Sequence, residues 1–263
     1  RHALDNTRPE VLFHAAAFKH VPLLQAQARQ AVRNNVIGTR VVAEAALAAG
    51  VRQFVLISTD KAVRPTNVMG ATKRAAEKLV QSLDGIGATR FITVRFGNVL
   101  DSAGSVVPLF SEQIRVGGPV TVTHPEVTRY FMTIPEACQL IMQAAAVGQG
   151  GEIFVLDMGE PILIRYLAEQ MIRLSGKRVG QDIAIGYVGL RPGEKLTEEL
   201  FLEDERPMPT PHQKLLLARS VKLDHRDVLL KIDDLDRSCQ AFDESALLRQ
   251  LRALGPEFVE AAG

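Results

Sequence analysis

The chain contains 263 residues, of which 46% are hydrophobic and 23% are charged, a composition typical of a globular protein with a substantial core. A formal net charge of +1 gives no electrostatic support for nucleic acid or an anionic membrane surface as a partner. No run of about 18 uninterrupted apolar residues occurs, so the sequence predicts no transmembrane helix. The two cysteines, Cys138 and Cys239, predict neither a disulfide framework nor a metal site, and their scarcity favours a reducing cytoplasm.

Short apolar runs alternate with helical patterns in the first half of the chain. Strands are predicted over 11–16, 54–58 and 91–96, and helices over 28–49 and 68–83. Strand, helix, strand, helix and strand at this spacing predict right-handed crossovers and a parallel sheet. We therefore expect an α/β fold.

The second half of the chain is less regular, and its predicted elements are shorter. They are, in order, a helix over 106–116, a short strand after 117–119, a helix over 135–146, a strand over 152–156, a helix over 164–174, a strand over 183–187, and two amphipathic helices near 223–235 and 243–254. Three prolines between 206 and 212 predict a loop without regular structure. No internal repeat is present in the sequence.

The segment over 58–73 concentrates polar groups at the carboxyl end of a predicted strand. A Thr-Asp-Lys run at 59–61 leaves that strand, and ligands bind at this edge of open parallel sheets. Met69 and Lys73 follow four residues apart, on one face of the next predicted helix. A strand-end turn, a helix cap and a surface ion pair are the alternative interpretation of these residues taken singly. Taken together, they favour a catalytic site.

The run at 58–73 also carries a resemblance to a known family. It resembles the corresponding segment of the CapD-type polysaccharide biosynthesis family of nucleotide-sugar 4,6-dehydratases, within the extended short-chain dehydrogenase/reductases. The resemblance covers essentially the whole chain and includes further segments at 14–23, 35–39, 95–110 and 189–195. It implies a partial Rossmann-type doubly wound parallel sheet, whose first strands are missing, with a smaller C-terminal α/β lobe for substrate.

The resemblance implies dehydration of UDP-N-acetylglucosamine or a related UDP-N-acetylhexosamine, with NAD or NADP as cofactor and NAD favoured. In that reaction hydride leaves C4 of the hexose for the cofactor, water is lost across C5 and C6, and the hydride returns to C6. The C4 ketone acidifies the C5 hydrogen, so the elimination needs a base for that hydrogen and an acid for the departing hydroxyl. Surface polysaccharide or glycan biosynthesis is the expected use of the product.

The resemblance also assigns the catalytic roles. It makes Lys61 the base at C5, Asp60 the acid at the C6 hydroxyl, Thr59 a group that orients the substrate hydroxyls, and Lys73 the residue that holds the nicotinamide ribose. A neutral Lys61 requires a dry site with other positive charge nearby. Met69 occupies the place where most short-chain dehydrogenases carry the tyrosine base, and its thioether cannot move a proton. The C4 hydroxyl proton then goes to water, to Thr59 or to another group; Met69 as core filler is the alternative.

Further contacts follow from the same resemblance. Besides Lys73, the cofactor is expected to contact His14, Ala15, Ala16, Asn35, Ser58 and Phe96. The nucleotide sugar is expected to contact Lys19, Asn98, Ser105, Val106, Thr121, His124, Arg191 and Glu194. A guanidinium suits a diphosphate because it forms forked, charge-assisted hydrogen bonds. A core position for His14 and a solvated side chain for Lys19 are the alternatives, and Arg129 is either structural or directed at phosphate.

The glycine-rich turn that binds a dinucleotide pyrophosphate is absent from the sequence. The resemblance places the start of the chain just before the fourth strand of a Rossmann fold, so we expect a fragment that binds cofactor poorly alone, with 11–16 on an open sheet edge. We expect 1–107 to be the remainder of the cofactor-binding domain, with 133–160 packed on it. The lobe that binds the nucleotide sugar is expected to comprise 108–132 and 161–263.

Two other functions compete with the dehydratase. A nucleotide-sugar epimerase or reductase of the same superfamily is disfavoured, because such enzymes usually carry tyrosine at the position of Met69 and no Asp-Lys pair after the strand-end threonine. A non-catalytic fragment that keeps the sugar-nucleotide pocket is the other alternative. We also expect self-association, and a longer protein that is attached to a membrane through a region absent from this sequence, with this portion facing the cytoplasm.

Overall fold

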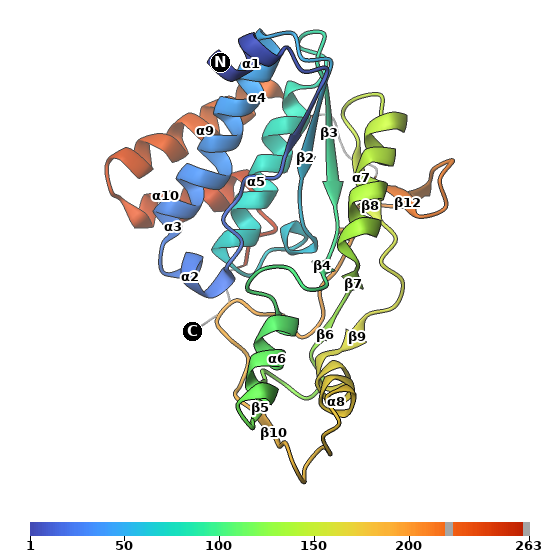
Figure 1. Cartoon of the computed structure of the whole chain (residues 1–263). Helices are drawn as coiled ribbons and strands as arrows, with labels where there is room; N and C mark the ends of the chain where they lie inside the picture. The colour runs from blue at the N-terminus through green and yellow to red at the C-terminus, as the bar shows by residue number, and fades with distance from the viewer. Residues whose placement is uncertain (219–222, 260–263) are drawn as a thin grey trace.

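A six-stranded sheet forms the centre of the fold (Figure 1). The structure is a computed structural model that describes residues 1–218 and 223–259. The first four strands in the order are parallel, and the last two run antiparallel to their neighbours. The order across the sheet is β1 (Val11–His14), β2 (Gln53–Ile57), β3 (Arg90–Arg95), β8 (Ile153–Leu156), β12 (Leu215–Ala218) and β11 (Pro207–Pro209).

Helices cover both faces of this sheet (Figure 1). One face carries α3 (Ala28–Val32), the π-helical segment η1 (Arg33–Ile37), α4 (Gly38–Ala48) and α5 (Val68–Leu83). The other face carries α7 (Ile134–Val147), which packs against β3 and β8. Two short helices, α1 (His2–Thr7) and α2 (Val21–Gln25), flank β1 in the sequence. The strand and helix patterns predicted in the first half of the chain are therefore confirmed, and the predicted helix over 28–49 is α3, η1 and α4 in direct succession.

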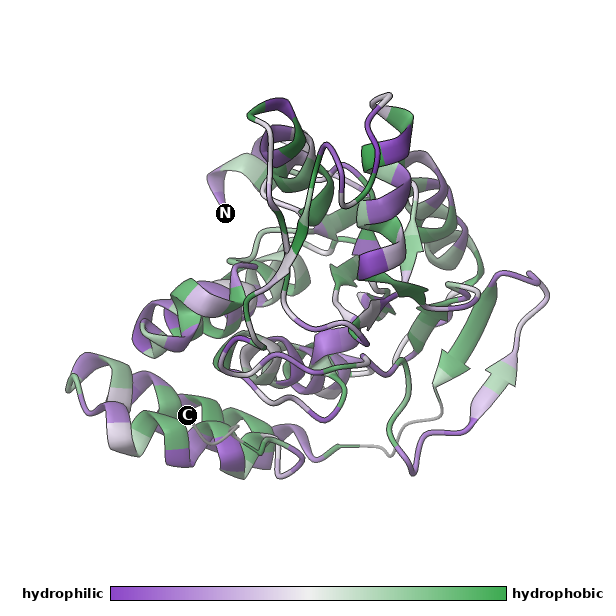
Figure 2. Cartoon of the chain, turned by 90° about the horizontal axis from the view of Figure 1, so that it is seen from below, coloured by the Kyte–Doolittle hydropathy of each residue, from purple (hydrophilic) through white to green (hydrophobic). Residues whose placement is uncertain are grey.

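The sheet is buried because apolar side chains meet it from both sides. Figure 2 shows its strands mainly in the hydrophobic colours, as expected for parallel strands that are covered on two faces. One core cluster joins Phe54 and Phe91 to α5, and a second joins Ile92 and Phe154 to α7. Strand β1 lies at the edge of the sheet, which confirms the predicted edge position of this segment. No helix in 1–218 or 223–259 is long and apolar enough to cross a bilayer.

A smaller lobe lies beyond the carboxyl ends of β1, β2 and β3 (Figure 1). Phe110 and Ile172 lie in its own core cluster. Two strands, β4 and β7, pair in parallel, and β6 pairs with β9 in antiparallel fashion. Its elements are β4 (Asn98–Val99), α6 (Val106–Arg115), β5 (Val120–Val122), β6 (Thr128–Arg129), β7 (Phe131–Met132), β9 (Ile162–Leu163), α8 (Ile164–Leu174) and β10 (Ile185–Tyr187).

The C-terminal part of the chain differs from the prediction. We expected all of 161–263 in the smaller lobe, but β11 and β12 extend the main sheet, and α9 (His225–Gln240) and α10 (Glu244–Leu254) pack on α3 and α5. The apolar faces of α9 and α10 are buried in the same core cluster as α5, which explains this position. The loop predicted for 206–212 is also wrong in part, since Pro207–Pro209 forms β11. Proline is tolerated there because β11 is an edge strand.

A buried ion network ties these segments together. Arg95 on β3 is completely buried, and it pairs with Glu77 of α5 at 2.9 Å and with Glu205 at 2.7 Å. Arg74 of α5 joins the network through Glu77 at 3.1 Å and through Glu257 at 3.1 Å. Arg95 and Arg74 hold the pKa of Glu77 at about 2, against the opposing effect of burial. The network therefore links the sheet, α5 and two C-terminal segments through charges that depend on one another.

Replacement of Arg95 by methionine is expected to destabilise the protein severely. The variant Arg95→Met leaves Glu77 and Glu205 buried with only the weaker support of Arg74, and loss of one partner costs about 3–5 kcal/mol in comparable buried pairs. Urea denaturation followed by circular dichroism measures the loss. Arg115→Met is the matched control, because Arg115 pairs with Glu112 on the exposed face of α6. Equal midpoints for the two variants would contradict a structural role for the network.

Candidate active site

A cavity of about 350 Å³ lies where β1, β2 and β3 end. Its walls come from the loops that follow these three strands, from the first turns of α5 and from the segment that leads into α6. Parallel strands place their carboxyl ends at one edge, so side chains far apart in the sequence meet there. The cavity lies between the main sheet and the smaller lobe and is the candidate active site.

Four of the five residues with predicted catalytic roles line this cavity: Thr59, Lys61, Met69 and Lys73. Asp60 does not line it, because its side chain is completely buried behind Thr59 and Lys61. The structure thus brings Thr59 and Lys61 together with Met69 and Lys73 of α5 around one cavity. Asp60 reaches the cavity only through its two neighbours.

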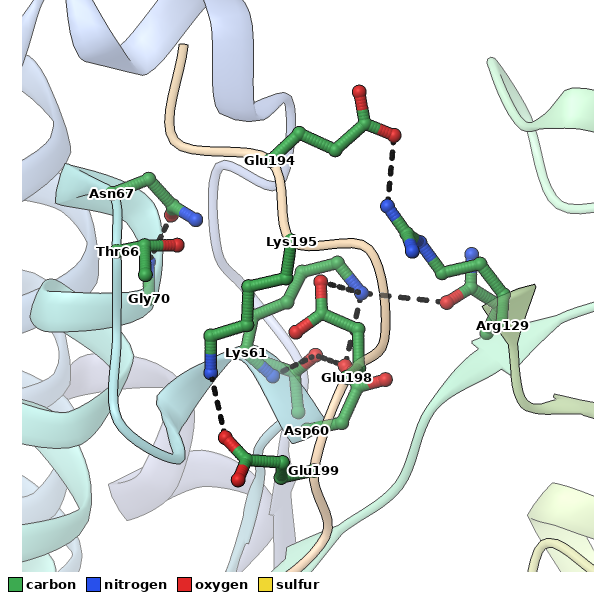
Figure 3. Close-up of polar contacts among 12 residues, drawn as sticks. Asp60, Lys61, Thr66, Asn67, Gly70, Arg129, Glu194, Lys195, Glu198 and Glu199 are labelled. Atoms are coloured by element: carbon green, nitrogen blue, oxygen red, sulfur yellow. Dashed lines mark hydrogen bonds and ion pairs between the residues drawn. The ribbon is translucent and has the colours of Figure 1, made fainter. Parts of the chain in front are cut away.

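The ammonium of Lys61 lies among three acceptors from three segments, two of which, Asp60 and Glu198, are labelled in Figure 3. It donates hydrogen bonds to Asp60 Oδ1 at 2.9 Å and to Asn98 Oδ1 at 3.3 Å, and Glu198 Oε1 lies 3.8 Å away. Burial lowers the pKa of Lys61, but the charges of Asp60 and Glu198 outweigh it and raise the pKa overall. The expected neutral lysine is thus not the form that these surroundings favour.

Thr59 and Asp60 form a hydrogen-bonded unit beside Lys61. Thr59 Oγ1 donates to Asp60 Oδ1 at 2.9 Å, so this oxygen accepts hydrogen bonds from both of its neighbours. The other carboxylate oxygen, Asp60 Oδ2, is buried without a hydrogen-bond partner in the part of the chain that the structure describes. A group in the cavity that gives a proton to Thr59 can therefore transfer a proton to Asp60 through the Thr59 hydroxyl.

The first turn of α5 is held tightly against the Asp60–Ala62 turn. Asn67 caps the helix by accepting a hydrogen bond from Gly70 N at 2.8 Å. A Cβ atom on Gly70 would lie 2.1 Å from Lys61 O, a separation that no side chain can adopt. Glycine at 70 therefore allows the helix to approach the strand-end turn, and this contact fixes Met69 and Lys73 relative to Lys61.

Lys73 has a different environment from Lys61. Its ammonium donates to Ile57 O at 2.5 Å, and burial lowers its pKa to about 8, with Glu77 opposing that shift. His14 is also buried, and burial together with the charge of Lys73 lowers its pKa to about 4. His14 is therefore uncharged at neutral pH, and Lys73 remains the cation on this side of the cavity.

The residues predicted to contact the cofactor divide into two groups. Ala15, Ser58, Phe96 and Lys73 line the cavity. His14, Ala16 and Asn35 do not. His14 shares a hydrogen bond of 2.9 Å with Thr39 and packs on Phe54 in the core, which is the alternative position that the sequence left open. The Asn35 side chain is bonded to both backbone groups of Phe18 and to Thr72, so it orders the loop that follows β1.

The residues predicted to contact substrate divide in the same way. Lys19, Asn98 and Ser105 line the cavity, whereas Val106, Thr121, His124, Arg191 and Glu194 do not. Thr121 is bonded to the side chain of Gln113, and His124 accepts a hydrogen bond from Glu126 N. Arg191 is exposed. Glu194 forms an ion pair of 2.8 Å with Arg129, which gives Arg129 a structural contact (Figure 3).

The turn that contains Arg191 and Glu194 has a structural function of its own. Gly193 O accepts hydrogen bonds from Thr66 Oγ1 at 2.8 Å and from Asn67 Nδ2 at 3.0 Å. This turn therefore holds the residue that caps α5. Glu198, which follows the same turn, was missed by the sequence analysis, and the available signal was weak: an acidic residue three positions after the segment over 189–195.

Comparison with known proteins supplies the family. Residues 1–220 match the family model described as "Polysaccharide biosynthesis protein". The chain belongs to this polysaccharide biosynthesis protein family. Over 236 residues it is 54% identical to the capsular polysaccharide biosynthesis protein CapD of Staphylococcus aureus, a match that covers 88% of this chain and 39% of CapD. This family member thus spans about two fifths of the length of that relative.

Solved structures resemble the fold of this family member. The structure of Pen from Bacillus thuringiensis aligns with a TM-score of 0.74 and 40% identity, covering 80% of this chain and 66% of Pen. DesIV from Streptomyces venezuelae, a dTDP-glucose 4,6-dehydratase with NAD bound, aligns with a TM-score of 0.64 and 22% identity, covering 72% and 64% of the two chains. These alignments confirm the predicted Rossmann-type α/β fold.

The variant Gly70→Ala is expected to disrupt the site because the added methyl group cannot fit beside Lys61 O. Either α5 or the Asp60–Ala62 turn has to move, and overpacking of this kind costs about 1–3 kcal/mol of stability. Urea denaturation gives the measurement. Gly38→Ala is the control: this helical glycine would place Cβ at an ordinary 3.5 Å from Arg33 O, so its stability should hold or rise by about 0.4–1 kcal/mol. Unchanged stability in Gly70→Ala would show that the contact is not tight.

Proposed function

We propose that the protein carrying this chain is an NAD-dependent 4,6-dehydratase that acts on UDP-N-acetylglucosamine or a related UDP-N-acetylhexosamine. The observation that carries the proposal is the arrangement of one cavity, in which Thr59 and Lys61 share Asp60 as their hydrogen-bond acceptor and face the same space as Lys73 and Asn98. The elimination needs an acid and a base close together, and this arrangement provides both. The named activity of DesIV, on the same fold, supports the proposal.

The described residues fit a nicotinamide cofactor at the Lys73 side of the cavity. An ammonium has three donors, and Ile57 O is the hydrogen-bond acceptor that the described residues provide for Lys73, so donors are available for ribose hydroxyls. Ser58 and Phe96 complete this wall, and the small side chain of Ala15 leaves room beside it. When bound here, NAD would supply the acceptor for hydride from C4 and the source of hydride for C6. NAD bound to DesIV supports this cofactor.

The opposite wall of the cavity suits the sugar nucleotide. Ser105 lies at the N-terminal end of α6, and its hydroxyl is buried without a hydrogen-bond partner in the described part of the chain. The N-terminal end of a helix favours negative charge, so a diphosphate oxygen is a suitable partner for it. Lys19 on the facing loop adds positive charge to this wall. Asn98 lies between this wall and Lys61 and can contact the hexose hydroxyls.

Proton balance in this site depends on Thr59 and Asp60. When C4 is oxidised, the C4 hydroxyl passes its proton to Thr59 Oγ1 while Thr59 passes its own proton to Asp60 Oδ1, because the two oxygens lie 2.9 Å apart. The same route in reverse delivers that proton to the C6 hydroxyl, which leaves as water. Asp60 thus acts as the acid through Thr59, and no proton from Met69 is needed.

Lys61 is the base for the C5 hydrogen in this proposal. Its neutral amine takes the proton from C5, the C5–H electron pair forms the C4–C5 enolate, and the C6–O bond then breaks. The ammonium so formed is stabilised by Asp60 and Asn98, and it returns the proton to C5 when C6 is reduced. Because only the neutral amine is a base, the rate is expected to rise with pH through the pKa of Lys61.

The decisive experiment incubates the full-length protein with UDP-N-acetylglucosamine and follows the sugar by NMR. Formation of a 4-keto-6-deoxy product supports the dehydratase, an inverted C4 without loss of water indicates an epimerase, and binding without turnover indicates a non-catalytic module. Lys61→Ala is expected to abolish the product while leaving UDP affinity nearly unchanged, since Lys61 does not contact the nucleotide in this proposal. Unchanged turnover in Lys61→Ala would reject the proposed base.

Thr59→Val tests the proton route separately. Valine matches the shape of threonine but has no hydroxyl, so kcat is expected to fall about 100-fold or more, the usual contribution of a positioned proton-transfer group. Thr59→Ser retains the hydroxyl and serves as the control, with activity close to that of the unsubstituted protein. A fully active Thr59→Val variant would show that the C4 proton leaves by another path.

A further inference from the structure

Glu198 is a buried carboxylate immediately behind the proposed base. Its side chain is 5% exposed, and its Oε1 atom lies 3.8 Å from Lys61 Nζ (Figure 3). It comes from the segment after the Gly193 turn, which also holds the cap of α5. The position of Glu198 beside Lys61 is thus fixed by the same segment that positions α5.

The distance between Glu198 and Lys61 decides how the two groups interact. A separation of 3.8 Å is too long for a hydrogen bond, so Glu198 and Lys61 form an ion pair without direct proton transfer. Asp60 and Asn98, at 2.9 Å and 3.3 Å, are the hydrogen-bonding partners of the same ammonium. Glu198 therefore acts on Lys61 through its charge.

Other charged groups around Glu198 already have partners. Arg129 of β6 pairs with Glu194 at 2.8 Å, and Lys195 pairs with Glu199 at 3.1 Å. Asp60, the other acidic group that faces Glu198, is bonded to Thr59 and Lys61. No hydrogen bond reaches the carboxylate of Glu198 from residues 1–218 or 223–259, so its buried charge is compensated mainly by Lys61, with smaller effects from Arg129 and Lys195.

We propose that Glu198 is a positioning residue for Lys61, whose buried negative charge holds the amine beside Asp60 and Asn98 and strengthens it as a base. This inference rests on the proposed dehydratase function. A base with greater proton affinity removes a carbon-bound hydrogen faster once it is neutral, but it becomes neutral only at higher pH. Burial of Glu198 next to Asp60 raises the pKa of its own carboxyl, which agrees with its need for a nearby cation.

The test compares Glu198→Gln with Glu199→Gln in the full-length protein. Glutamine removes the charge of Glu198 at nearly constant volume, so the rising limb of the kcat–pH profile is expected to move to lower pH by about one unit or more, the effect of one opposite charge at this range. The plateau of kcat at high pH is expected to fall. Glu199 belongs to the same segment but pairs with Arg64 and Lys195, so Glu199→Gln is expected to keep the original profile.

A purely structural role for Glu198 gives a different result, namely a lower kcat at every pH with the limb in its original place. That result would overturn the inference, as would an unchanged profile. Glu198→Asp keeps the charge on a shorter side chain and is expected to give a limb between those of Glu198→Gln and the unsubstituted protein. A Glu198→Asp profile that coincides with that of Glu198→Gln would also count against a role of the charge.

An NMR titration of the Lys61 side chain separates this inference from the proposed function. The pKa of Lys61 is expected to fall in Glu198→Gln and to stay constant in Glu199→Gln, whether or not turnover occurs. If the protein yields no 4-keto product while the pKa of Lys61 falls in Glu198→Gln as expected, the dehydratase proposal fails, but the effect of the Glu198 charge on Lys61 is supported. If product forms normally and the pKa of Lys61 is the same in both variants, the inference about Glu198 fails and the dehydratase proposal stands.

Discussion

The contact between the backbone of Gly70 and the carbonyl of Lys61 is the constraint on which the site depends. It leaves no space for a side chain on α5 at this point, so the helix and the strand-end turn cannot shift independently. The Gly193 turn holds the other side of the helix terminus through Thr66 and Asn67. Groups from a strand end, a helix and a distant turn are thereby held in one arrangement, as required where reacting groups have to be pre-positioned.

The electrostatics of the two cavity lysines differ because their partners differ. Lys61 has two carboxylates close to its ammonium, and together they raise its pKa despite burial. Lys73 is also withdrawn from water, but its hydrogen-bond partner is the neutral carbonyl of Ile57, so burial lowers its pKa to about 8. Glu77, the carboxylate whose charge acts on Lys73, is paired with Arg95 and Arg74. Lys61 therefore has a raised proton affinity, whereas Lys73 is a cation with hydrogen-bond donors available to a ligand.

How much the sequence could predict depended on whether a feature is local. The parallel strands and α5 follow from periodicity, and the position of Thr59 and Lys61 at a ligand-binding edge follows from the rule that ligands bind at strand ends. The catalytic roles of Thr59, Lys61 and Lys73 were implied by the family resemblance. The packing position of α9 and α10 could not be predicted. An amphipathic pattern shows that one face of a helix is buried, but it does not show which element covers that face. The β11 strand was not predicted because it contains prolines. Proline is tolerated only in an edge strand, and the sequence does not show that β11 lies at the edge of the sheet.

Glu198 and the Glu77–Arg95 network were unpredictable for a related reason. A buried charge can be predicted only when its ion-pair partner is known, and these partners lie far away in the sequence. The segment over 189–195, predicted to contact substrate, shows the converse, because two of its residues also serve the fold. Glu194 pairs with Arg129, and Gly193 O accepts a hydrogen bond from Asn67.

Met69 shows how the parts of the site depend on one another. It lines the cavity on the helix face, where a hydroxyl could have served as the proton acceptor, but a thioether cannot take that part. Among the hydroxyls that line the cavity, that of Thr59 lies at the strand end and is already bonded to Asp60. In the proposed dehydratase reaction, proton transfer is thus concentrated on the strand-end turn, in contact with Lys61. A single carboxylate would then serve both the oxidation at C4 and the loss of water from C6, and the tight packing of α5 at Gly70 keeps that turn in place.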